Sequence, residues 1–147
     1  MGEIMTNKEI VSYVKSELNQ FETLKKRSHQ NNLEVIGKIN LIIRANGGTP
    51  NPNGITSSLK DFDESWKSPI WDEISKLEAD IDSDDLRIKR INEFLKRLQP
   101  KDREIITNLH IKNGRDKAKY SDYCFVVNRS RRSLFTYVEQ LILRKWK

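Results

Sequence analysis

The segment Ile74–Leu98, ISKLEADIDSDDLRIKRINEFLKRL, decides the fold of this chain. Its apolar residues recur at alternating spacings of three and four, the pattern of a helix that buries one narrow stripe against another helix. The positions of this stripe are Ile74, Leu77, Ile81, Asp84, Ile88, Ile91, Leu95 and Leu98. Asp84, its one polar member, could fix the register of the helix pairing or face solvent at a local weakening of the helix, and we expect the second.

The helix that carries this stripe is predicted to run from residue 69 to residue 98. Ser68 supplies an N-cap and Pro69 a first-turn proline. The acids Asp80, Asp82, Asp84 and Asp85 compete for backbone hydrogen bonds, which could break the helix. We expect a continuous helix that is locally weak at these acids.

A second long helix is predicted upstream, because Thr6 followed by Glu9 is a capping-box signature and neither Gly nor Pro occurs between them and Gly37. Apolar residues follow helical spacing at both ends of this stretch, but the same register meets polar residues in the middle. The apolar positions are Val11, Val14, Leu18, Phe21, Val35, Ile39 and Ile42, and the polar ones are Lys25, Ser28 and Asn32. The weak middle predicts a kink or break around residues 28–32.

Residues 46–58, NGGTPNPNGITSS, contain three Gly, two Pro and no charge, which is typical of a loop. We expect this loop to be mobile and to join the two long helices. The helices can then fold back as an antiparallel hairpin, or pair with a second copy as a coiled coil. The sequence thus predicts an all-α protein with a helical oligomerisation region over residues 1–98 and a separate domain over residues 99–147.

Positive charge is concentrated at the C-terminal end. Residues 86–147 contain 17 Lys or Arg and 6 Asp or Glu, a net charge of +11, whereas residues 61–85 contain 10 acids and 2 bases. Such an excess of positive charge on a small helical unit is the electrostatic footprint of nucleic-acid binding. The sequence leaves open whether the acidic segment is a protein-docking face or a spacer.

The basic region reads as a series of helices. Pro100 is expected to begin a helix over residues 101–111, with Asn113 and Gly114 as its stop. A short helix over residues 116–123, a turn over 125–128 and a long helix capped by Ser130 follow. The predicted buried residues of these helices are Ile105, Ile106, Leu109, Leu134, Val138 and Leu141, with Tyr137 and Leu143 assigned less firmly.

A short helix, a tight turn and a longer helix in this order are typical of a helix-turn-helix, whose second helix projects first-turn side chains into the DNA major groove. Arginine is the side chain best shaped to bind guanine O6 and N7 together. The predicted base-contacting residues are Arg129, Arg131, Arg132, Ser133 and Thr136. Basic side chains and helix N-termini contact phosphates, and the predicted phosphate-contacting residues are Lys101, Arg103, Lys117, Lys119 and Ser130.

Composition excludes several other classes. The sequence has no run of about 20 apolar residues and no basic-then-apolar signal pattern at its start, so we expect a cytoplasmic protein without membrane contact. Cys124 is the lone cysteine, and His29 and His110 lie far apart, so neither metal nor cofactor is expected. No phosphate-binding glycine loop or nucleophile–base set occurs, which argues against an enzyme.

The stretch LKRLQPKDREIITNLHIKNGRDKAKYSDYCFVVNRSRRSLFTYVEQLILR, residues 95–144, resembles the region-four module of sigma factors. It resembles still more the late-gene transcription regulators of Gram-positive phages of the RinA and ArpU type. The residues that carry the resemblance are Pro100–Arg103 with Glu104 and Ile105, Tyr120, the NRS triplet 128–130, and Leu134. Residues 116–124, DKAKYSDYC, depart from the family by being more polar and aromatic.

This resemblance covers about the C-terminal third of the chain. It implies a DNA-binding transcription regulator, an activator acting at one promoter region of a prophage or mobile element. The residues themselves predict only binding to double-stranded DNA, with a homodimer as the simplest way to read two half-sites. Two alternatives remain: a helical protein–protein interaction module, for example one that binds RNA polymerase, and a phage DNA-packaging recognition subunit.

Overall fold

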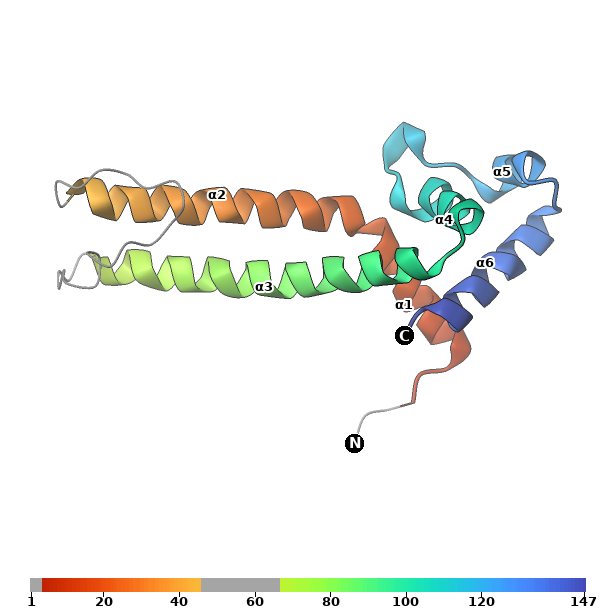
Figure 1. Cartoon of the computed structure of the whole chain (residues 1–147), viewed down its shortest axis with the longest axis horizontal. Helices are drawn as coiled ribbons and strands as arrows, with labels where there is room; N and C mark the ends of the chain where they lie inside the picture. The colour runs from red at the N-terminus through yellow and green to blue at the C-terminus, as the bar shows by residue number, and fades with distance from the viewer. Residues whose placement is uncertain (1–3, 46–66) are drawn as a thin grey trace. The chain divides into compact units, whose positions relative to one another are not determined.

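A computed structural model of the chain describes residues 4–45 and 67–147 (Figure 1). The predicted mobile loop, residues 46–58, lies outside the described residues. Within them the structure is helical and contains no β-strand, so the predicted all-α class is confirmed. The elements are α1 (Asn7–Asn19), α2 (Phe21–Ala45), α3 (Lys67–Arg97), α4 (Pro100–Ile106), the π-helix η2 (Thr107–Ile111), the 3-10 helix η3 (Gly114–Asp116), α5 (Tyr120–Val126) and α6 (Arg131–Lys145).

Packing divides the chain into two compact units. Unit 1 contains Met1–Thr23 and Arg87–Lys147, and unit 2 contains Leu24–Leu86. This division differs from the sequence-based boundary at residue 98, because α1 packs on α6 and on η2, and the end of α3 packs with the C-terminal helices through the ring contact of Phe94 with Trp146. The basic C-terminal helices therefore share their core with the N-terminal helix.

Unit 2 is an antiparallel pair formed by the α2 and α3 residues that belong to it. Lys38 Nζ donates to Glu73 at 2.7 Å and Arg27 donates to Asp84, so the later of the two α2 residues pairs with the earlier of the two α3 residues. A cluster of buried apolar side chains lies at one end of this helix pair. It consists of Ile39, Ile42, Ile43 and Ile74, and the partly buried Val35, Ile70 and Trp71 pack against it. α3 begins at Lys67, so the expectation that Ser68 is its N-cap is wrong. Pro69 is tolerated in this first turn, where its missing N–H is not needed.

Polar side chains bridge the two helices of unit 2 where the sequence predicted weakness. Asp84 is buried, with 4% of its surface exposed, and it accepts from Arg27 Nε at 2.6 Å and from Arg27 Nη2 at 2.7 Å. The expectation that Asp84 faces solvent is therefore wrong, because this bidentate pair compensates the buried carboxylate. The predicted continuity of the helix is confirmed, since α3 runs unbroken through Asp80–Asp85.

The break predicted around residues 28–32 is not present in α2, which is continuous over this stretch. Ser28 is buried and donates its hydroxyl to Asp85 at 2.6 Å, and the Asn32 amide donates to the Ser28 carbonyl at 2.8 Å. The polar middle of the stripe thus has polar partners. The interruption lies instead at Gln20, between α1 and α2, where Arg87 Nη2 donates to the Gln20 side chain at 2.7 Å.

Helix α1 begins where the sequence predicted. The Thr6 hydroxyl accepts the Glu9 backbone N–H at 3.2 Å and so satisfies one of the amides that a helix start leaves unpaired. In unit 1, α1 buries Val11, Val14 and Leu18. Glu17 is also buried, and it accepts from the Arg87 guanidinium of α3 at 3.1 Å. An apolar face and one buried ion pair therefore hold α1 in unit 1.

The C-terminal helices of unit 1 differ from the prediction within residues 101–111 and at both ends of α5. Residues 101–111 form two elements, because α4 gives way to the π-helix η2, whose wider turn buries Leu109, His110 and Ile111 in succession. The short helix predicted over residues 116–123 is α5, which begins at Tyr120 after the 3-10 turn η3 and continues to Val126, into the turn predicted over residues 125–128. The predicted core residues are buried as expected, namely Ile105, Ile106, Leu109, Leu134, Val138 and Leu141, while Tyr137 and Leu143 are half-buried.

The buried His110 makes the stability of unit 1 depend on pH. Burial and, to a smaller extent, the charges of Lys15 and Lys117 together lower the pKa of His110 to about 4. An unfolded histidine titrates near pH 6.5. As the pH falls from about 6.5 to about 4, the unfolded state therefore binds a proton that the folded state does not. We expect the free energy of unfolding to lose roughly 3 kcal/mol over this window.

This loss is measured by urea unfolding of the full chain between pH 7 and pH 4. The variant His110→Gln should lack this part of the pH dependence. His29→Gln is the matched control, because His29 is exposed on α2, and it should keep the wild-type dependence. Identical pH dependence in His110→Gln and the wild type would contradict the prediction.

Candidate nucleic-acid interface

The link from α5 to α6 is fixed by backbone and side-chain hydrogen bonds. Asn128 adopts a positive φ of 55°, a conformation that asparagine tolerates better than most residues. The Arg129 N–H then donates to the Cys124 carbonyl at 2.9 Å. Ser130 is the N-cap of α6, as predicted, and its hydroxyl accepts the Ser133 N–H at 3.0 Å. The start of α6 at Arg131 therefore follows from the residues directly before it.

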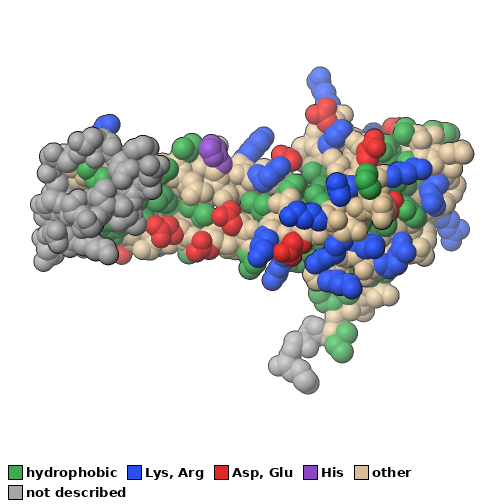
Figure 2. Space-filling model, in the orientation of Figure 1, with side chains coloured by type: hydrophobic (Ala, Val, Ile, Leu, Met, Phe, Trp, Pro, Cys, Tyr) green, Lys and Arg blue, Asp and Glu red, His purple; other side chains and the backbone are tan. Residues whose placement is uncertain are grey.

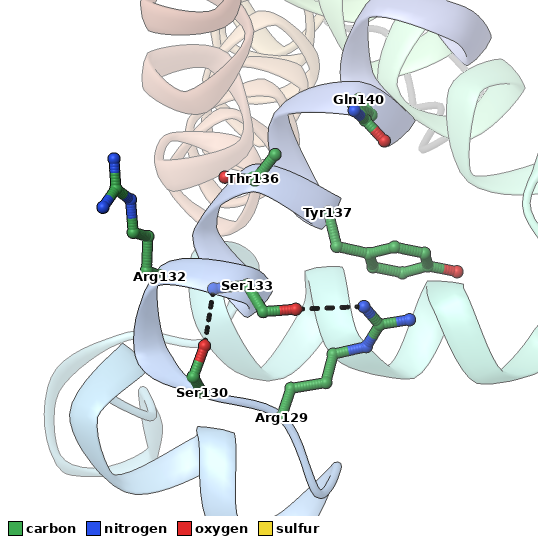
Figure 3. A pocket seen from close by; sticks show the side chains of 7 residues that line it. All are labelled: Arg129, Ser130, Arg132, Ser133, Thr136, Tyr137 and Gln140. Carbon is green, nitrogen blue, oxygen red and sulfur yellow. Dashed lines mark hydrogen bonds between the residues drawn. The ribbon is translucent and has the colours of Figure 1, made fainter.

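A hollow runs along the first three turns of α6 (Figure 3). Side chains four residues apart lie on the same side of a helix, and two such rows meet here. One row is Arg132, Thr136 and Gln140, and the other is Arg129, Ser133 and Tyr137. Opposite them, the buried residues Leu134, Val138, Leu141 and Ile142 hold α6 in the core. The helix therefore presents an arginine-rich polar face whose position is fixed by its apolar face.

Arg129 is held in place on this face. Its Nη1 donates to the Ser133 hydroxyl at 3.3 Å, and its guanidinium carbon lies 4.2 Å from the centre of the Tyr137 ring. The Tyr137 hydroxyl donates to Asp102 of α4 at 2.5 Å. This hydrogen bond, together with burial, raises the pKa of Tyr137 above its usual value. Tyr137 therefore stays protonated and joins α6 to α4.

A second hollow lies beside the first, with Arg129 and Tyr137 lining both. Lys101 lines this second hollow and is exposed. Among the predicted phosphate-contacting residues, Lys101 and the N-cap Ser130 thus lie next to the α6 face, and Lys119 is exposed immediately before α5.

Two other predicted phosphate-contacting residues make hydrogen bonds within unit 1. Arg103 donates to the carbonyls of Leu95 and Leu98 at 3.0 and 3.2 Å, at the end of α3. Lys117 Nζ donates to the Asn19 side chain at 2.8 Å, at the end of α1. Both bonds are to other elements of the same unit, so these two cations help to hold its helices together.

The predicted base-contacting residues do not all gather at the hollow. Arg129, Arg132, Ser133 and Thr136 line it, whereas Arg131 is exposed but is not part of its lining. One residue corresponds to a rotation of 100° around a helix, which separates Arg131 from Arg132. Sequence reasoning missed Gln140 and Asp102 and assigned Tyr137 to the core. Gln140 and Tyr137 could have been found from the sequence, because steps of four residues lead from Arg132 to Gln140 and from Arg129 to Tyr137.

Lys and Arg side chains gather over unit 1 in the space-filling view (Figure 2). Exposed bases occur on several of its elements, namely Lys101, Lys112, Arg115, Lys119, Arg129, Arg131, Arg132 and Arg144. Their charges add to the positive field at the face of α6, where the first-turn N–H groups of the helix already favour an anion.

Within residues 4–45 and 67–147, no cluster of three or more His, Cys, Asp or Glu side chains is placed to hold a metal ion. None of the helices in this described part of the chain has the length and apolar character needed to cross a membrane.

Comparison of the chain with protein-family models, with curated proteins and with solved structures finds no match. The resemblance to the RinA and ArpU regulators therefore stays a prediction from the residues quoted above.

Proposed function

We propose that the chain binds double-stranded DNA sequence-specifically and regulates transcription, with α5, the turn and α6 acting as a helix-turn-helix. The observation that carries this proposal is the exposed face of α6, where Arg129, Arg132 and Thr136 line one hollow beside the helix start. A recognition helix contacts base edges with the side chains of its N-terminal turns. A basic surface and a helix-turn-helix are two of the criteria for a nucleic-acid-binding protein, and the proposed arrangement combines both.

The face of α6 also favours particular base contacts. Arg132 is exposed and lies one turn before Thr136, so both can reach neighbouring base pairs in a major groove. Arginine selects guanine, and the threonine methyl suits the methyl group of thymine. Ser130 and Lys101 lie beside this face, and the proposal assigns to them the phosphate contacts that orient the helix.

We propose further that the chain acts as a homodimer, with unit 2 as the oligomerisation region of hairpin or coiled-coil type. Leu33 and Leu41 support this, because they lie two turns apart on α2 and each exposes more than half of its surface. A dimer places two recognition helices on half-sites about one DNA turn apart. In line with the family resemblance, the proposed role is that of a transcription activator of a phage or mobile element.

The test selects bound fragments of the source genome with the purified full chain at about 150 mM salt, where non-specific binding is weak. We expect recovery of one promoter-proximal site with two related half-sites. Arg132→Ala should abolish this recovery. Arg131→Ala, which removes the same charge from the adjacent position outside the hollow, should weaken binding without changing the recovered site.

Recovery of nothing above background by the folded wild-type chain would contradict the proposal. The alternative would then be a protein-binding module, for which the exposed Phe125 and Val126 at the end of α5 offer an apolar contact. That alternative predicts retention of purified RNA polymerase by the chain, a result that loss of DNA binding alone does not give.

A further inference from the structure

Arg129 lies outside α6, directly before its N-cap, yet its side chain extends along the first turns of the helix (Figure 3). The guanidinium reaches Ser133, one turn further on, and lies over the ring of Tyr137, two turns further on. An arginine at a turn ordinarily samples many rotamers, and ordering it costs conformational entropy. Here two contacts already restrict the side chain in the free protein.

The contacts leave part of the guanidinium available for a ligand. Tyr137 covers one face of the group, and the bond to Ser133 uses Nη1. The edge formed by Nε and Nη2 carries two N–H donors that point the same way, which is the arrangement that matches guanine O6 and N7. Stacking on an aromatic ring does not compete with hydrogen bonds made at this edge, since the two use different surfaces of a planar cation.

The ring that supports Arg129 is itself anchored. Tyr137 is half-buried, and its hydroxyl donates to Asp102 at 2.5 Å. Asp102 belongs to α4, whose Ile105 and Ile106 are buried in the core of unit 1. The core therefore holds α4, and Asp102 of α4 binds the Tyr137 hydroxyl. The Tyr137 ring in turn contacts the Arg129 guanidinium. Side chains that bind precisely are usually held by such a second layer of contacts.

We infer that Tyr137 and Asp102 are positioning residues that hold the Arg129 guanidinium for bidentate reading of one guanine in the DNA major groove. This inference rests on the function proposed above and adds a base and a mechanism to it. The benefit is specificity, because a guanidinium fixed in one plane matches guanine and cannot swing towards a neighbouring acceptor or phosphate.

The test is selection from a pool of duplexes with a randomised central segment, performed with the full chain. The wild type should select a site that contains an invariant guanine. Arg129→Ala and Tyr137→Leu should both lose the preference at that one position and bind the selected site roughly tenfold more weakly, the scale of one bidentate contact. Their binding to unselected duplexes should change much less.

Subtler variants separate positioning from folding. Tyr137→Phe keeps the ring but loses the anchor, and it should weaken the guanine preference about threefold, the effect of one hydrogen bond. Asp102→Ala should match it, whereas Asp102→Asn keeps an acceptor oxygen and should restore the preference. Tyr123→Phe is the matched control, because it removes a tyrosine hydroxyl that accepts from Asn108 elsewhere in unit 1. It should leave the selected site unchanged.

The possible results distinguish the inference from the function on which it rests. Loss of the guanine preference in Arg129→Ala but not in folded Tyr137→Leu or Tyr137→Phe would overturn the positioning role and leave DNA reading intact. A uniform loss of binding to all duplexes in the Tyr137 variants would show a structural role only. Failure of the wild type to select any site would overturn both the inference and the proposed function.

Discussion

Raising the salt concentration from about 50 to about 200 mM is expected to weaken DNA binding by the full chain about a thousandfold or more. The physical reason is release of counterions from DNA when lysine and arginine neutralise its phosphates. With about five to eight phosphate contacts, the logarithm of the binding constant should fall with the logarithm of salt with a slope of roughly −5 to −7. Titration of a labelled duplex at several salt concentrations measures this slope.

Single charge variants connect the slope to the structure. Lys119→Gln removes an exposed base of unit 1 and should reduce the slope by about one. Lys38→Gln is the matched control, because Lys38 belongs to unit 2 and is bonded to Glu73. It should leave the slope unchanged. Binding that does not respond to salt would remove the electrostatic basis of the proposed function.

Replacing Phe94 by alanine is expected to destabilise the chain by about 3–5 kcal/mol. Phe94 of α3 is fully buried, and its ring packs against Trp146 with the ring centres 5.5 Å apart. The substitution removes apolar burial and leaves a cavity that the surrounding helices fill only in part. Because Trp146 directly follows α6, the same change loosens the support of the proposed recognition helix.

Urea unfolding of the full chain measures this loss. Phe125→Ala is the matched control, since it is the same substitution at a side chain with 81% of its surface exposed. It should change the free energy of unfolding by no more than about 0.5 kcal/mol. Equal effects of the two substitutions would contradict the packing described for unit 1.

Local signals in the sequence predicted the starts of α1 and α6 and the buried faces of the helices. Thr6 and Ser130 cap their helices as expected, because capping depends on residues within one turn. Asp84 could not be placed in the same way. Its partner Arg27 lies 57 residues away in the sequence, and only the pairing of α2 with α3 brings the two together. The π-helix η2 that follows α4 was likewise not predicted from the sequence.

The candidate site was predicted in part. Helical spacing placed Arg132, Ser133 and Thr136 on one face, because the start of α6 was predicted correctly. Arg131 was predicted with them because it is an arginine in the first turn of the helix, although a helical rotation separates it from Arg132. Spacing can place Tyr137 on this face, but it cannot show that the Tyr137 hydroxyl donates to Asp102, which lies on a different helix. Contacts between elements distant in sequence were therefore the part that pattern analysis could not supply.

The division of unit 1 into two chain segments has a consequence for how the protein folds. Leu24–Leu86 stands between these segments in the sequence, so their first contact closes a long loop at a considerable entropic cost. Pairing of α2 with α3 through Arg27 and Asp84 brings the ends of that loop together and shortens it. We therefore expect the helix pair to form early and to set the rate at which the basic unit assembles, although none of its residues belongs to the proposed DNA-reading face.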